Sequence, residues 1–265
     1  MTTLILQSDL PEPPWVTPAR WRLPGVMPLP LEDWLIRDEV YAEQMALRDH
    51  LIATKPEAVH ALLPSAVPAA AECYDMVLDA LRADPGYSFE DGAVLRPDGV
   101  RVALDPDAPL LTLGRLIQAD LCLMEPGPDG HILTGAILCF PAYWTLSEKI
   151  GRPMLRIHRP VHEYDDDVAR RVQRMFDALR PDRLLWRANA NLHASAELFT
   201  PRREGDPERR VPEGAGKFVR SERQILRKLP ETGATVFSIH TYMVRIESLS
   251  DAARQELWRL SPPVK

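Results

Sequence analysis

The stretch LCLMEPGPDGHILTGAILCF, residues 121–140, decides the fold class, because it holds two apolar runs separated by a turn. Proline and glycine in the middle of the stretch are typical of a turn, and the apolar residues on either side favour strands. The stretch therefore predicts an antiparallel β-hairpin around Gly127 to Gly130.

Further strands are predicted on both sides of this hairpin. The runs GAVLRP and GVRVAL flank the turn Pro97-Asp98-Gly99 and predict a second hairpin, with a short helix from Leu110 to Gln118 between the two pairs. Strands are also predicted at Leu184 to Asn189 and at Ala234 to Ile246. The pentapeptide LPETG, residues 229–233, matches a cell-wall sorting signal, but a strand-like run follows it, so we interpret it as a turn.

Helical spacing of apolar residues predicts helices before and after the strands. They are Glu32 to Lys55, Glu57 to Leu63, Pro68 to Ala83, Asp165 to Leu179 and Leu249 to Leu260. Helices that precede a group of hairpins indicate an α+β fold with an antiparallel sheet. We expect residues 1–84 to form a helical region with a proline-rich arm at 10–30, packed on a main domain at 85–265 as one compact unit. The charged segment from Thr200 to Gly216 predicts a loop or flap.

Composition excludes several classes of function. The formal net charge is −6 without a dense basic block, which argues against a nucleic-acid or anionic-membrane partner. The three cysteines are far apart and form no C-x-x-C pair, which indicates a reducing compartment and no iron–sulfur cluster on this chain. No apolar run approaches the length of a membrane span, and we expect a cytoplasmic protein. Neither a G-x-G-x-x-G nor a G-x-S-x-G motif is present.

Two histidines stand close together in LRIHRPVHEY, residues 155–164. His158 and His162 are at the spacing that would place them on one face of a helix, as in helical zinc motifs. Pro160 lies between them, however, and it disfavours a helix at this point. The stretch therefore predicts a strand that carries both imidazoles on one face.

Five stretches in order resemble one family: LGRLIQADLCLM (113–124), LCFPAYWTLSEKIGRPM (138–154), IHRPVHEY (157–164), WRANANLH (186–193) and RSERQILRKLPETGATVFSIHTY (220–242). Together they resemble the haem-dependent oxidative N-demethylase family, of the type found as the haem-binding subunit of dimethylamine monooxygenase. The resemblance implies a PAS-like sheet that binds haem b, and oxidation of a methyl group on a small amine with O2 and release of formaldehyde. It also implies that NAD(P)H supplies electrons through flavin and iron–sulfur partner subunits, so we expect a separate reductase and a hetero-oligomer.

The same resemblance implies roles for individual residues. His158 is the candidate axial ligand and metal-binding residue, with hydrogen bonding in the core as its alternative role, and His193 is the second choice as ligand or distal group. Candidate partners of the haem propionates are Lys149, Arg223 and Arg227, of which the two arginines belong to a basic cluster with Arg220 and Lys228 that alternatively forms a solvated or ion-paired face. Arg187 and Asn189 are candidates for contact with substrate or oxygen, unless they fix the end of a strand.

Two positions depart from the family pattern. His162 stands where the family tends to have proline, and Ala190 stands where it usually has tryptophan. Loss of an indole would open space and remove an aromatic wall for a cationic amine, so a changed substrate or a lost activity is an alternative. The competing functions are therefore a non-catalytic haem sensor or carrier, and a haem-free subunit with a role in assembly.

Overall fold

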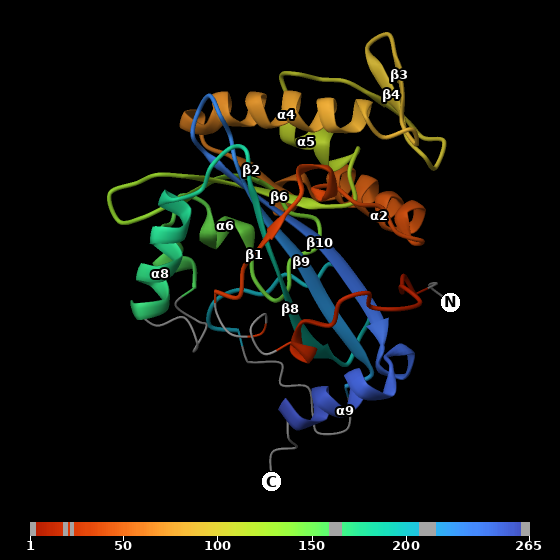
Figure 1. Cartoon of the computed structure of the whole chain (residues 1–265). Helices are drawn as coiled ribbons and strands as arrows, with labels where there is room; N and C mark the ends of the chain where they lie inside the picture. Colours follow the sequence, from red (N-terminus) through yellow and green to blue (C-terminus); the bar gives the residue numbers. More distant parts are fainter. Residues whose placement is uncertain (1–3, 18–20, 22–23, 159–165, 207–215, 261–265) are drawn as a thin grey trace.

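A computed structural model describes residues 4–17, 21, 24–158, 166–206 and 216–260 of the chain. It shows a seven-stranded sheet in the order β1-β8-β9-β10-β6-β7-β2, with every strand pair antiparallel (Figure 1). Its strands are β1 (Met27–Leu29), β2 (His60–Leu62), β6 (Asp120–Glu125), β7 (Ile132–Ile137), β8 (Leu184–His193), β9 (Phe218–Lys228) and β10 (Thr235–Arg245). A separate three-stranded sheet contains β3 (Ser88–Glu90), β4 (Ala93–Leu95) and β5 (Arg101–Ala103).

Helices lie near both ends of the described chain, just before β6, and between β7 and β8. They are α2 (Tyr41–Thr54), α3 (Pro56–Val59), α4 (Val67–Arg82), α5 (Pro109–Gly114), α6 (Leu146–Lys149), α7 (Met154–Ile157), α8 (Asp166–Asp177) and α9 (Asp251–Leu260), with 3-10 turns at Pro14–Val16, Leu31–Asp33, Pro64–Ala66 and Ile246–Ser248. The predicted α+β class with an antiparallel sheet is confirmed. No helix in the described part of the chain is long and apolar enough to cross a membrane.

The hairpin predicted from residues 121–140 is present as β6 and β7, with Leu121 opposite Ile137 and a register shift between Leu123 and Met124. The LPETG segment is a turn, as predicted, and it joins β9 to β10. Gly233 adopts a positive φ of 71°, which suits glycine because it has no side chain to clash. The amide of Leu229 donates to the carbonyl of Ala234 across this turn at 2.8 Å.

Side chains alternate between two hydrophobic layers, one on each face of the large sheet. Val236 belongs to the layer under α2, α4 and α5, whereas Phe237 packs against the layer under α6 and α8 (Figure 1). A third cluster lies against α9 and contains Trp15 of the proline-rich arm, whose side chain is fully buried. The arm therefore packs on the main part of its own chain, and β1 joins the sheet beside β8.

Two local predictions are wrong. Residues 60–62 form β2, paired with β7, rather than the end of a helix; Leu63 precedes Pro64, and a residue before proline favours the extended backbone. Residues 154–157 form the single helical turn α7 rather than a strand, and His158 caps it. Pro160 and His162 lie outside the described residues, so the predicted face shared by the two histidines stays a prediction.

One predicted helix differs in extent, and one strand was not predicted. The pattern over 32–55 becomes a 3-10 turn at Leu31–Asp33 and then α2 at Tyr41–Thr54. No strand was predicted for residues 220–228, whose basic side chains were candidate propionate partners or, alternatively, a solvated or ion-paired face. These residues belong to the long strand β9, inside the sheet. Because β9 is a strand, its side chains alternate between the two faces of the sheet, and this alternation decides which of them share the candidate site.

Candidate functional site

A row of polar side chains crosses one face of β8, β9 and β10. Register places Arg187 opposite Gln224, and Asn189 opposite Glu222, while Glu222 in turn lies opposite Thr241. Residues at alternate positions on these strands share the face. We call this row the polar face; its members are Arg187, Asn189, His193, Arg220, Glu222, Gln224 and Thr241.

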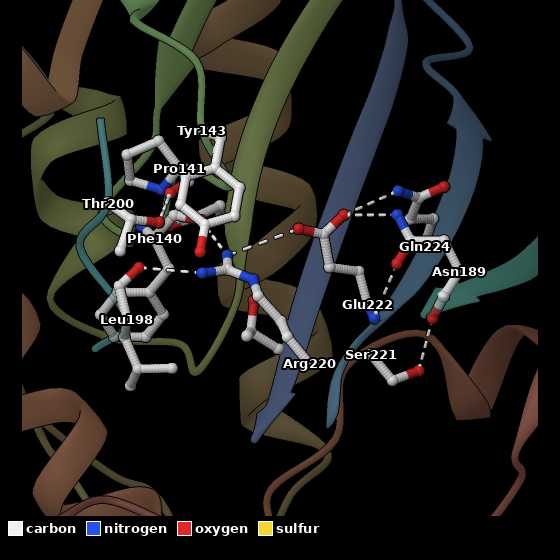
Figure 2. Close-up of polar contacts among 12 residues, drawn as sticks. Phe140, Pro141, Tyr143, Asn189, Leu198, Thr200, Arg220, Ser221, Glu222 and Gln224 are labelled. Carbon is white, nitrogen blue, oxygen red and sulfur yellow. Dashed lines mark hydrogen bonds and ion pairs between the residues drawn. The ribbon is translucent and has the colours of Figure 1, made fainter. Parts of the chain in front are cut away.

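Hydrogen bonds connect the polar face from one strand to the next (Figure 2). The side-chain amide of Asn189 makes two hydrogen bonds with Glu222. Its Nδ2 donates to Oε2 of Glu222 at 2.9 Å, and its Oδ1 accepts from the backbone N–H of Glu222 at 3.0 Å. Gln224 donates to the same carboxylate oxygen at 2.9 Å and accepts from Nη1 of Arg187 at 3.0 Å. Both predicted residues, Arg187 and Asn189, thus belong to one network centred on Glu222.

Arg220 lies within this network and is 1% exposed. Its guanidinium donates to the carbonyls of Leu198, at 3.0 Å, and Phe140, and lies 3.4 Å from Oε1 of Glu222. A buried cation needs a nearby negative charge, because its removal from water is costly. Glu222 therefore compensates the charge of Arg220 while it orders Asn189 and Gln224.

His193 stands at the end of β8 and is also 1% exposed. The hydroxyl of Tyr143 lies 3.0 Å from its Nδ1, and the two rings stack with centroids 4.9 Å apart. Tyr143 adopts a positive φ of 58°, an unusual backbone for a residue with a side chain. Burial, and then the charge of Arg220, lower the pKa of His193 to about 4, so the imidazole is neutral at pH 7. Its Nε2 atom has no hydrogen-bond partner among the described residues.

His158 follows directly after α7. Its Nδ1 lies 3.0 Å from the carbonyl oxygen of Met154. Because a carbonyl only accepts, the proton is on Nδ1, and the neutral ring carries its lone pair on Nε2. Burial lowers the pKa of His158, and the positive charges of Lys149 and Arg187 lower it further. The structure thus brings three predicted residues together: His158, Lys149 and Arg187.

Lys149 is buried and is held by two acceptors. Its Nζ donates to Oε1 of Glu204 at 2.5 Å and to the carbonyl of Ile157 at 2.9 Å. Glu204 also accepts two hydrogen bonds from Arg156, at 3.0 and 2.8 Å. Lys149 therefore lies beside the His158 turn, but its charge is already compensated by a carboxylate.

The structure does not bring Arg223 and Arg227 to this site. Both point to the opposite face of the sheet, where Arg223 donates to the backbone carbonyls of Asp33 and Trp34, at 2.6 and 3.3 Å. The guanidinium of Arg227 lies over the Trp34 ring at 4.2 Å from its centroid. Neighbouring residues of a strand face opposite ways, which separates these two arginines from Arg220, Glu222 and Gln224. They attach the N-terminal segment to the sheet.

Ala190 also lies away from the polar face. Its side chain packs against the cluster that contains Trp15 and Val219, on the other side of the sheet from Asn189. The absence of tryptophan at this position therefore does not enlarge the candidate site. The inference of an altered pocket from Ala190 is corrected by this placement.

Five residues of the site were not among those selected from the sequence: Tyr143, Glu204, Glu222, Gln224 and Thr241. The alternation of Arg220, Glu222 and Gln224 was a usable signal, because period-2 spacing is typical of a strand with one functional face. Tyr143 and Glu204 reach the site through contacts between distant segments, and no local pattern marks them.

The donor set suits a haem rather than a bare metal ion. No group of three or more histidine, cysteine or acidic side chains gathers within the described ranges. A haem iron needs only one or two protein ligands, because the porphyrin supplies the others, and a neutral imidazole is a common axial ligand. Arg187 is half-buried, and its buried Nε atom has no hydrogen-bond partner in the described part of the chain, which suits a carboxylate such as a propionate. The residues present therefore fit the group.

Fold and site together define an α+β protein in which a polar face on an antiparallel sheet combines the neutral imidazole of His193 with guanidinium groups, beside the neutral imidazole of His158. A family model described as haem-dependent oxidative N-demethylase, alpha subunit-like, matches residues 25–260, and the chain belongs to this family. The match confirms the family inferred from the five motifs. Its description also indicates a role as one subunit of a larger assembly.

Proposed function

We propose that the chain is the haem-binding subunit of an oxidative N-demethylase, with Nε2 of His158 as the iron ligand. One observation carries the proposal: His158 is neutral, its Nδ1 proton is directed to the Met154 carbonyl, and the cations Lys149 and Arg187 are close to the ring. A histidine ligand normally donates its second ring N–H in this way, which sets the direction of the other nitrogen.

Three residues of the polar face, together with Lys149 beside His158, fit supporting roles. Arg187 would bind a propionate, with Lys149 nearby, in place of the roles first assigned to Arg223 and Arg227. Asn189 and His193 would face the substrate. His193 is neutral at pH 7, so its ring would contact the substrate as a hydrogen-bonding group that adds no charge.

When bound, haem b would activate O2 for oxidation of an N-methyl group. The overall reaction consumes the methylated amine, O2, two electrons and two protons, and yields the demethylated amine, formaldehyde and water. We propose a dimethylamine-type substrate and electron supply from NAD(P)H through flavin and iron–sulfur partners on other subunits. The three cysteines of this chain are buried free thiols, which supports a reducing, cytoplasmic location and a separate electron-transfer subunit.

A haem titration of the apoprotein tests the ligand assignment. We expect a saturable, sharp Soret band for the wild-type protein and for His193→Ala, and a shifted or lost band for His158→Ala. A band that survives in His158→Ala and disappears in His193→Ala would transfer the ligand role to His193. No saturable band in the wild-type protein would contradict the haem proposal and favour the assembly role.

A second experiment separates an enzyme from a haem carrier or sensor. The haem-loaded protein is supplied with dimethylamine, NADPH and a flavin and iron–sulfur reductase, and formaldehyde is measured. We expect formaldehyde in proportion to the NADPH consumed. Reversible O2 or CO binding without formaldehyde would instead support a non-catalytic carrier or sensor.

A further inference from the structure

The segment after β8 is hydrogen-bonded to the segment after β7. We call residues 198–206 the strap. The hydroxyl of Thr200 donates to the carbonyl of Pro141 at 2.9 Å, and the backbone carbonyl of Thr200 accepts from the backbone amide of Tyr143 at 3.0 Å (Figure 2). The hydroxyl of Thr145 donates to the carbonyl of Arg202 at 2.8 Å. The strap therefore has a fixed path over the residues that lead into α6.

Glu204 connects the strap to both short helices of this region. Its carboxylate accepts from Lys149 at the end of α6 and from Arg156 in α7. The hydrogen bonds from Arg156 and Lys149 lower the pKa of Glu204 to about 2, so it is ionised at any working pH. Arg156 and Glu204 form two parallel hydrogen bonds, an arrangement that adds geometric specificity to the ion pair.

The α7 turn needs such external support. It contains only Met154–Ile157, and no side chain caps its N-terminus. A single helical turn is unstable by itself, because its first hydrogen bond must offset the ordering of several residues. Lys149 donates to the carbonyl of Ile157, immediately before His158, while Arg156 is held from outside the turn. Glu204 is the carboxylate that these two cations share.

We propose that Glu204 is a positioning residue, whose contacts with Lys149 and Arg156 hold the α7 turn and thereby fix the direction of the His158 imidazole. The inference rests on the proposed role of His158 as haem ligand. It adds a function to the strap: a segment distant in sequence sets the geometry of the ligand without contact with the iron. Without the Glu204 charge, the buried Lys149 would have no carboxylate partner among the described residues.

The test uses Glu204→Gln, Glu204→Asp and, as a matched control, Glu197→Gln, which makes the same change at an exposed position just before the strap. Two quantities are measured: amide hydrogen exchange of the peptide that contains Ile157 and His158 in the apoprotein, and the Soret spectrum and haem dissociation rate after loading with haem b. We expect Glu204→Gln to speed exchange and to raise the dissociation rate about 10–100-fold, with a mixed-ligation spectrum. Glu204→Asp should lie between Glu204→Gln and the wild type, and Glu197→Gln should match the wild type.

The two readouts separate failure of this inference from failure of the proposed function. Unchanged exchange in Glu204→Gln would overturn the positioning role whether or not haem binds. Faster exchange with an unchanged haem spectrum and dissociation rate would also overturn it, because the turn would then be supported without an effect on His158. If the wild-type protein takes up no haem, the proposed function fails, and the exchange data still decide whether Glu204 holds α7.

Discussion

His193 illustrates how surroundings set the protonation state of one side chain. The ring is buried, the Arg220 guanidinium is near, and Tyr143 stacks on one face. A protonated imidazole would place a second positive charge in a site with little water. The neutral form is therefore favoured down to acid pH, and the lowered pKa of His193 has a consequence for stability.

The first prediction concerns the pH dependence of unfolding. In the unfolded chain His193 takes up a proton below its ordinary pKa of 6.5, whereas in the folded protein it does so only near 4. The unfolded state binds more protons in this window, so the free energy of unfolding falls as pH drops from about 6.5 to about 4, by about 2 kcal/mol at pH 5. Urea unfolding of the wild-type protein and of His193→Gln at pH 7.5 and 5 measures this difference.

In His193→Gln the stability lost between these two pH values should be smaller than in the wild type by that amount. Equal losses in the two proteins would show that His193 titrates normally in the folded state. The comparison within one pair of proteins removes the contribution of the other titrating groups, which both proteins share.

At the scale of elements, β9 shows why the site was only partly predictable. Its residues Arg220, Glu222, Arg223 and Arg227 are charged, and charge usually indicates an exposed face. Here Glu222 compensates the buried Arg220 on one face, while the half-buried Arg223 and Arg227 contact Trp34 and its neighbour on the other. Arg220 and Glu222 stand two residues apart on β9, so their alternation is visible in the sequence. The burial of this face, and the contacts of Arg223 and Arg227 with a distant segment, are absent from any local pattern.

The second prediction tests this compensation. Glu222→Gln keeps the shape of the side chain but removes its charge, which leaves Arg220 buried without a carboxylate. We expect the free energy of unfolding to fall by about 3 kcal/mol, since loss of one partner of a buried ion pair is costly. Chemical denaturation provides the measurement, with Glu231→Gln in the exposed LPETG turn as the control that should change little. A loss below about 0.5 kcal/mol would contradict the role of Glu222.

The α7 turn illustrates a different source of error. Pro160 restricts the backbone of Arg159 and of nothing earlier, so a helical turn that ends at Ile157 is compatible with it. The proline rule argues against a helix through both histidines, but it does not require a strand before them. Long apolar patterns predicted secondary structure more accurately. The helices predicted at residues 68–83 and 165–179 correspond to α4 and α8, and both predicted hairpins are present.

For the whole molecule, an edge of the sheet is covered by residues 4–9, which precede the proline-rich arm and are called the N-terminal arm. β10 pairs with β6 only from Thr235 to Ile239. Beyond that point the backbone of Gln7 donates to the Met243 carbonyl at 3.0 Å, and the Gln7 side chain accepts from the Met243 amide at 2.8 Å. One residue of the arm thus replaces part of a neighbouring strand. An uncovered strand edge is a site of unwanted pairing between chains.

The third prediction follows from this contact. Gln7→Ala removes the side-chain bonds to Met243, Thr241 and Asp38, and we expect the free energy of unfolding to fall by about 2 kcal/mol. Amide hydrogen exchange at Met243 should become faster, because its amide loses its acceptor. Ser8→Ala, at the exposed neighbouring position, is the control and should change stability by less than about 0.5 kcal/mol. Slow exchange at Met243 in Gln7→Ala would contradict the covering role of the arm.

Sequence motifs across the whole chain were sufficient for the family, and they brought forward His158, Lys149 and Arg187, which the fold places together. They misplaced Arg223 and Arg227, because motif spacing does not state which face of a strand a side chain takes. They also gave Ala190 a role in the site, although it packs on the opposite side of the sheet. The division of the sheet into two faces is the information that only the fold supplies.

The central claim is that His158 ligates a haem iron, and ligand rescue tests it most directly. His158→Gly is loaded with haem b, and its optical and electron paramagnetic resonance spectra are recorded without and with added imidazole. We predict that the histidine-ligated spectrum of the wild-type protein is lost in His158→Gly and restored by imidazole, which would occupy the place of the missing side chain. A histidine-ligated spectrum in His158→Gly without added imidazole would contradict the claim.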